Sequence, residues 1–137
     1  MPDAPETRIH SAAPSFLVSD VDQTVRWYVD ELGFTLAGSF PPKPPTGWAS
    51  LMRDGAELML QRLPGYQKPD LYDQRGAAGV WDVYFRTNGV RRLYASLKDK
   101  PFIKQPLKRQ PYKDWEFEVQ DPNGYILVFG GDAEREG

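Results

Sequence analysis

Apolar and polar residues alternate along two pairs of short runs, and a turn sequence separates the two members of each pair. Asp54-Gly55 connects the two runs of the first pair, and Asn123-Gly124 lies between the two runs of the second. Alternation with a period of two predicts half-buried strands, and Asp-Gly or Asn-Gly between strands favours a tight turn. Two β-hairpins are therefore expected, with strands at residues 48–53, 56–62, 115–120 and 125–130.

Two other segments carry apolar residues at helical spacing, three and four positions apart. For the first, residues 21–32, Asp20 is the expected N-cap with Gln23 as its capping-box partner, and Gly33 is placed to end the helix. For the second, residues 90–97, the expected cap is Asn88. Further short strands are expected at residues 14–19, 34–40, 81–87 and 102–104, and proline-containing loops at 41–47 and 106–113.

The same pattern occurs twice along the chain. Trp48 and Trp115 are 67 residues apart, as are Asp54 and Asp121. A chain of 137 residues is therefore expected to hold two copies of one strand–helix–strands unit. Neither copy could bury a core alone, so the two must pack together, and a cleft is expected where the half-sheets meet.

This repeat divides the chain into a flexible leader at 1–13, one domain at 14–131 and a charged tail at 132–137. Within the domain, the two modules cover about 14–62 and 80–131. The link between them, 63–79, has no strong period. It is either a plain linker or a functional loop that binds a partner or covers the cleft.

The composition of the chain excludes several classes of function. The formal net charge is −2 and charges of both signs are interspersed, which argues against nucleic-acid and anionic-membrane partners. No apolar run is long enough to span a bilayer. The chain has no cysteine, which excludes disulfides and thiolate metal sites and fits a cytoplasmic protein.

Several sequence blocks then point to a family. Phe16-Leu17-Val18-Ser19-Asp20-Val21 leads into Trp27-Tyr28 and Leu32-Gly33-Phe34, and Trp115-Glu116-Phe117 precedes Asp121-Pro122-Asn123-Gly124-Tyr125. Over about residues 14–131, this order and spacing resembles the vicinal oxygen chelate superfamily of glyoxalases, bleomycin-resistance proteins and extradiol dioxygenases. The resemblance implies an α+β fold of two βαβββ modules, each curled into a half-barrel around a cleft, and commonly a homodimer.

The same resemblance implies four metal-ligand positions, which are usually His or Glu. Here they correspond to Ala13, Met59, Asp82 and Val128, with Ser15 in place of Ala13 if the register slips. Only Asp82 suits a hard cation. A two-residue slip would bring in Glu57 or Gln61, but two apolar positions would remain. We therefore expect neither metal nor other cofactor.

The candidate ligand-binding residues each have a structural alternative. Trp48, Trp81 and Trp115 could stack on a planar ligand or could fill the core. Asp82 could bind a ligand or act as a base, or it could pair with Arg86 or another basic residue. Tyr112 follows Gln110-Pro111, a segment that family members often share. The predicted ligand-binding set is Trp48, Glu57, Met59, Gln61, Trp81, Asp82, Tyr112, Trp115 and Val128.

These observations predict a small-molecule binding protein that sequesters a planar or amphipathic compound in an aromatic-lined cleft, without metal. Two enzymatic alternatives stay open. One is a metal-dependent lyase or dioxygenase with unconventional ligands. The other is a metal-free isomerase or lyase in which Asp82 is the base.

Overall fold

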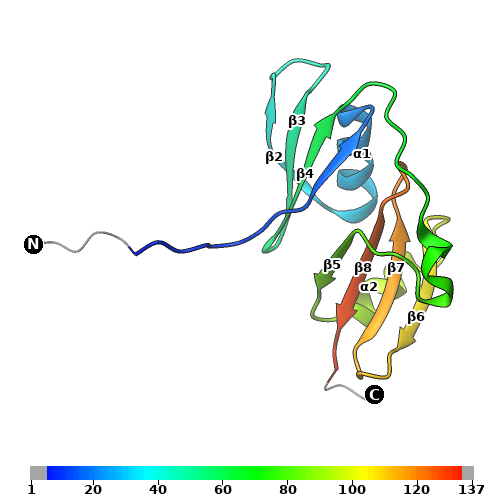
Figure 1. Cartoon of the computed structure of the whole chain (residues 1–137). Helices are drawn as coiled ribbons and strands as arrows, with labels where there is room; N and C mark the ends of the chain where they lie inside the picture. Colours follow the sequence, from blue (N-terminus) through cyan, green and yellow to red (C-terminus); the bar gives the residue numbers. More distant parts are fainter. Residues whose placement is uncertain (1–5, 134–137) are drawn as a thin grey trace, which may run out of the picture.

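The computed structural model describes residues 6–133. These residues form an α+β fold of two four-stranded mixed sheets and three helices, and the sheets do not close into a barrel (Figure 1). Residues 1–5 of the predicted leader and 134–137 of the predicted tail lie outside the described residues. None of the described helices combines the length and apolar character needed to cross a membrane.

The first module runs through β1 (Ser15–Val18), α1 (Val21–Leu32), β2 (Thr35–Phe40), β3 (Trp48–Arg53) and β4 (Ala56–Arg62). Its sheet has the order β1-β4-β3-β2, with β1 parallel to β4. The predicted helix limits are confirmed: Asp20 accepts a hydrogen bond from the Gln23 N–H, and Gly33 is left-handed at φ 70°.

The second module repeats this topology. The link contains the 3₁₀ helix η1 (Tyr72–Ala78), after which come β5 (Val83–Arg86), α2 (Val90–Leu97), β6 (Ile103–Arg109), β7 (Trp115–Gln120) and β8 (Ile126–Gly131). The sheet order is β5-β8-β7-β6, with β5 parallel to β8. The expected pair of βαβββ modules is therefore present.

Two local predictions are wrong. Strand β6 continues to Arg109 through Pro106, where a loop was expected. Its pairing with β7 is irregular and β6 is an edge strand, so the missing N–H of the proline is tolerated. In addition, Gly89 rather than Asn88 is the N-cap of α2. Its N–H donates to Asp132 Oδ1 at 2.8 Å, so the cap comes from the far end of the chain.

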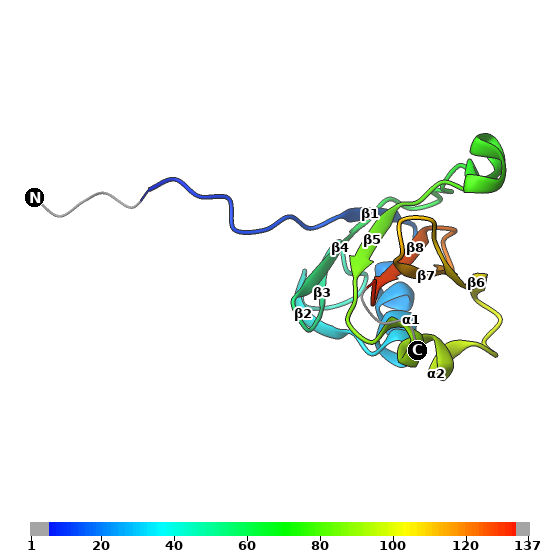
Figure 2. The same ribbon diagram turned by 90° about the horizontal axis from the view of Figure 1, so that it is seen from below.

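Helices α1 and α2 lie on the same side of the sheets, and the strands arch around them (Figure 2). Helix α1 packs on β2, β3 and β4, and α2 packs on β6, β7 and β8. One hydrophobic core runs through both modules. Aromatic contacts cross between them: Trp27 meets Phe102 edge-on, and Phe34 contacts Phe85.

Candidate functional site

Strand β7 carries two acidic side chains on the sheet face that points away from the helices. Phe117 and Val119 pack in the core, and alternation along the strand puts Glu116 and Glu118 on the opposite face. Glu116 is 4% exposed and Glu118 is 9% exposed. Carboxylates buried to this extent need hydrogen-bond donors or counter-ions.

Aromatic side chains supply the donors. The hydroxyls of Tyr84 and Tyr112 both donate to Glu116 Oε2, at 2.7 and 2.6 Å. Glu118 Oε1 accepts the Tyr72 hydroxyl at 2.5 Å, and its Oε2 accepts the Trp81 indole N–H at 3.2 Å. None of the ion pairs in the described part of the chain involves either glutamate. We call the surface formed by these six residues the glutamate face: Tyr72, Trp81, Tyr84, Tyr112, Glu116 and Glu118.

The phenols of this face are weaker acids than free tyrosine and therefore stay protonated. Burial, reinforced by the bond to Glu118, raises the pKa of Tyr72 to about 12. Burial and then Glu116 raise the pKa of both Tyr84 and Tyr112 as well. At neutral pH the tyrosines are thus hydrogen-bond donors to the two glutamates.

Two glycines make room for the tyrosines. A Cβ on Gly130 would lie 1.9 Å from the Tyr84 hydroxyl oxygen. A Cβ on Gly79, whose φ is +72°, would lie 2.8 Å from the Tyr72 ring. Any larger residue at these positions would displace a tyrosine, so the glycines help to set the geometry of the face.

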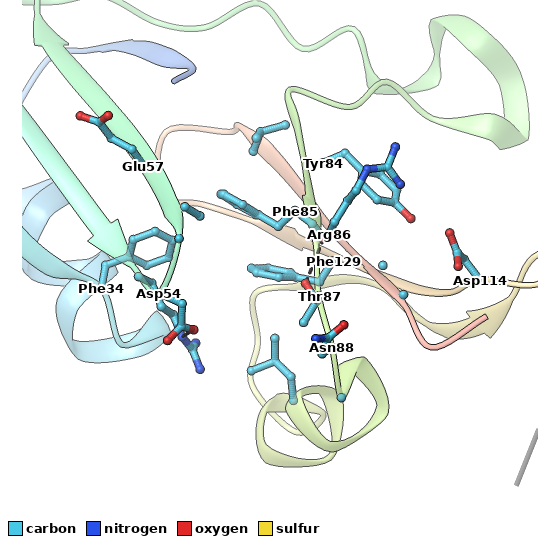
Figure 3. A pocket seen from close by; sticks show the side chains of 18 of the residues that line it. Phe34, Asp54, Glu57, Tyr84, Phe85, Arg86, Thr87, Asn88, Asp114 and Phe129 are labelled. Atoms are coloured by element: carbon cyan, nitrogen blue, oxygen red, sulfur yellow. Dashed lines mark hydrogen bonds and ion pairs between the residues drawn. The ribbon is translucent and has the colours of Figure 1, made fainter. Parts of the chain in front are cut away.

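A cleft of about 1120 Å³ lies between the modules, beside the free edge of β5. Figure 3 shows Phe34 and Glu57 on one side of it and Phe85 on β5 on the other. Tyr84 also lines the cleft, and its hydroxyl reaches Glu116. The cleft and the glutamate face therefore meet at Tyr84.

The predicted ligand-binding residues fall into groups. One group lies at the glutamate face and consists of Trp81, Tyr112 and Val128. Val128 packs there with Tyr72 and Tyr84. Four others lie on the corresponding open face of the first sheet, because their strand neighbours are in the core. There Glu57 accepts the Ser50 hydroxyl at 2.6 Å and Gln61 accepts that of Ser15 at 3.0 Å. These four are Trp48, Glu57, Met59 and Gln61.

Trp115 and Asp82 lie apart from the glutamate face. Trp115 packs against the core beneath the guanidinium of Arg91. Asp82 accepts the Ile126 N–H at 2.8 Å and lies 3.6 Å from Lys68 Nζ. Its basic partner is thus Lys68 and not Arg86, whose guanidinium lies over the Tyr84 ring.

Sequence reasoning missed Glu116 and Glu118 as site residues, together with Tyr84. The signal was present in Trp115-Glu116-Phe117-Glu118-Val119, where acids alternate with apolar residues. That pattern predicts acids on one face of a strand. It does not show that loop tyrosines will cover them.

Two packed βαβββ modules with open sheet faces are an architecture that this chain shares with a known family. The chain belongs to the glyoxalase/bleomycin resistance protein/dioxygenase superfamily, whose family model matches residues 8–129. None of the curated proteins matches the chain.

Solved structures share the fold at low identity. TioX from Micromonospora sp. ML1 is 21% identical, with a TM-score of 0.67 over 87% of this chain and 95% of that one. The bleomycin-binding protein of bleomycin-producing Streptomyces verticillus, solved with copper(II)-bleomycin, is 20% identical, with a TM-score of 0.64 over 90% and 97%. The bleomycin resistance determinant encoded on transposon Tn5 is also 20% identical, with a TM-score of 0.67 over 90% and 98%.

The metal site implied by the family does not fit the residues present. Strand pairing sets Ser15 opposite Met59 and Tyr84 opposite Val128. A thioether and a valine cannot bind a hard cation, and Asp82 is already engaged by Ile126 and Lys68. Within the described residues, no three His, Cys, Asp or Glu side chains cluster where they could hold a metal.

Proposed function

We propose that this protein binds a planar or amphipathic small molecule at the glutamate face and sequesters it without a metal. The observation that carries the proposal is the buried pair Glu116 and Glu118, whose charges are held by phenol and indole donors and by no ion pair in the described residues. Such a surface offers two carboxylates and several ring faces to an organic cation.

The energetic basis is burial of the ligand's ring. A planar ring system that buries about 150 Å² gains roughly 4 kcal/mol at about 25 cal/mol per Å². The carboxylates then select orientation, since an amine or hydroxyl on the ring can donate to Glu116 or Glu118. Two of the structural relatives are by name a bleomycin-binding protein and a bleomycin resistance determinant, which supports a binding role.

We further propose a homodimer that covers the open faces. Phe40 and Trp48 on the first sheet are exposed, and so are Trp81 and Tyr112 beside the second. A second copy would remove these rings from water and enclose the ligand. On this proposal Trp48, Glu57, Met59 and Gln61 border the same ligand as the glutamate face.

Catalysis by Asp82 has less support. The main-chain N–H of Ile126 and the ammonium of Lys68 hold its carboxylate. A general base must be free to reach the proton that it removes. The contacts of Asp82 are those of a structural residue that joins the link to β8.

Calorimetric titration with 9-aminoacridine, a planar cation, tests the proposal. Glu116→Gln and Glu118→Gln should each weaken binding at least tenfold, because a charge-assisted hydrogen bond contributes about 1.5–3 kcal/mol. Glu31→Gln is the matched control, since it removes the same charge from α1, where Glu31 pairs with Lys100 at 3.5 Å. Absence of binding, or equal losses in all three variants, would overturn the proposal.

A further inference from the structure

The link between the modules places one of its own aromatic rings on the glutamate face. Between residues 69 and 79, Tyr72 is the buried side chain, at 8% exposure, while the residues around it are exposed. Its ring packs with Ile126 and Val128, and its hydroxyl donates to Glu118 at 2.5 Å. The Lys104 ammonium lies over the ring, 4.5 Å from its centroid.

This arrangement is that of a bound ligand. A flat ring lies on an apolar patch, a polar hydrogen points at a buried carboxylate, and a cation lies over the ring. The occupant belongs to a loop rather than to the body of either module. A ligand that reaches Glu118 must therefore compete with the Tyr72 phenol for the same oxygen.

The loop is built so that Tyr72 can leave without unfolding the sheets. Lys68 anchors the first part of the link through Asp82, so movement can be confined to residues 69–79. At the far end, Gly79 takes φ 72° and ψ 175°, a conformation open to glycine. A second irregular glycine, Gly76 at φ 67° and ψ −138°, interrupts η1.

We propose that Tyr72 is an internal occupant of the ligand site, and that the ligand displaces it with a flat ring bearing a hydroxyl or protonated amine. This inference rests on the proposed function and specifies its ligand class. The ring takes the place of Tyr72 on Ile126 and Val128, and its donor takes over Glu118. Segment 69–79 then opens as a cap.

Tyr72→Ala tests whether the vacated site accepts such a ring. The probe is p-cresol, which is the tyrosine side chain as a free molecule, with toluene as the probe that lacks the donor. We expect p-cresol to raise the melting temperature of Tyr72→Ala and not that of Leu71→Ala, a neighbouring exposed position. Toluene should have a smaller effect. No stabilisation by p-cresol, or equal stabilisation of both variants, overturns the inference.

Trypsin cleavage after Arg75, which is exposed within the cap, reports opening in the intact chain. Tyr72→Phe keeps the ring and should speed this cleavage about tenfold, because it loses a hydrogen bond to a carboxylate. In the wild type, bound 9-aminoacridine should also speed it. If 9-aminoacridine binds but leaves Arg75 cleavage unchanged or slower, the displacement fails while the proposed function stands. If it does not bind at all, the proposed function fails and the p-cresol result alone decides whether the face accepts a phenol.

Discussion

The Tyr28 hydroxyl donates a 2.6 Å hydrogen bond to Asp121 Oδ2 in the centre of the molecule. Tyr28 is fully buried on α1 of the first module, and Asp121 is 4% exposed in the β7–β8 turn of the second. The other oxygen of Asp121 accepts the N–H groups of Asn123 and Tyr125. One carboxyl group therefore shapes a turn and joins the two modules.

Asp121 should make stability fall as the pH rises. Burial raises the pKa of Asp121 to about 6, despite the opposing hydrogen bonds. A carboxyl whose pKa is raised on folding contributes stability that is complete below its unfolded pKa, near 3.8, and is lost as the pH rises through about 6. Asp121→Asn removes this titration. Relative to the wild type, the variant's free energy of unfolding should increase by about 2–3 kcal/mol between about pH 4 and pH 7.

Urea denaturation of both proteins across that pH range checks this expectation. Subtracting the two curves cancels the other titrating groups, which are common to both proteins. Parallel curves for the wild type and Asp121→Asn would show that Asp121 has an ordinary pKa and that its burial is compensated.

Asp22 should behave in the opposite way. Its carboxylate accepts the Thr46 hydroxyl at 2.6 Å and the Thr46 N–H at 3.0 Å, which holds the proline-rich loop to α1. These bonds lower the pKa of Asp22 below 3.8, so its contribution is present above pH 3.8 and is lost as the pH falls through the lowered value. Asp22→Asn should cost about 1 kcal/mol near neutral pH and less in acid, as measured by the same denaturation series. A cost that grows on acidification would contradict this account.

Local chemistry made much of the fold predictable. Asp20, Gly33 and Asp54-Gly55 each act through their own backbone neighbourhood, so their effect can be recognised from a few residues. The cap of α2 by Asp132 could not be recognised in this way, because it joins residues more than forty positions apart. Likewise, Pro106 can lie within β6 because β6 is an edge strand, and that position is known only once the sheet is assembled.

The site was harder to predict because residues at equivalent positions of the repeat point to opposite faces of their sheets. Trp48 and Trp115 both lie six residues before a turn aspartate, yet Trp48 is on an open face and Trp115 is on the core side. In the first hairpin the last pair is Arg53 with Ala56, and in the second it is Gln120 with Ile126. The longer second turn shifts the alternation by one residue, which moves every side chain to the other face. Trp115 as a ligand-binding residue stays a prediction.

Gly130→Ala should disrupt the glutamate face from within the sheet. The added Cβ would lie 1.9 Å from the Tyr84 hydroxyl oxygen and 2.5 Å from its Cζ, so Tyr84 must leave Glu116. We expect a loss of about 2–4 kcal/mol in the free energy of unfolding, from overpacking and from the loss of one of the two phenol donors of Glu116.

Gly38→Ala is the control for this experiment, since its Cβ would meet Trp48 at an ordinary 3.6 Å. It should cost less than about 1 kcal/mol. In a Tyr84→Ala background the cost of Gly130→Ala should shrink, and a double-mutant cycle measures the coupling. Equal costs for Gly130→Ala in both backgrounds would mean that Tyr84 is not the group displaced.

The tryptophans offer a spectroscopic test of where a ligand binds. The Trp81 indole donates to Glu118, whereas Trp115 packs on the core side of β7. A compound at the glutamate face must therefore alter the surroundings of Trp81 and leave those of Trp115 nearly unchanged. We expect Trp81→Phe to reduce the fluorescence change that 9-aminoacridine produces in the wild type, since Trp48 on the first sheet can also report the ligand, and Trp115→Phe to preserve it. Calorimetry on each variant would separate lost signal from lost binding. The reverse pattern, with the signal lost in Trp115→Phe, would move the ligand from the glutamate face to the core side of β7.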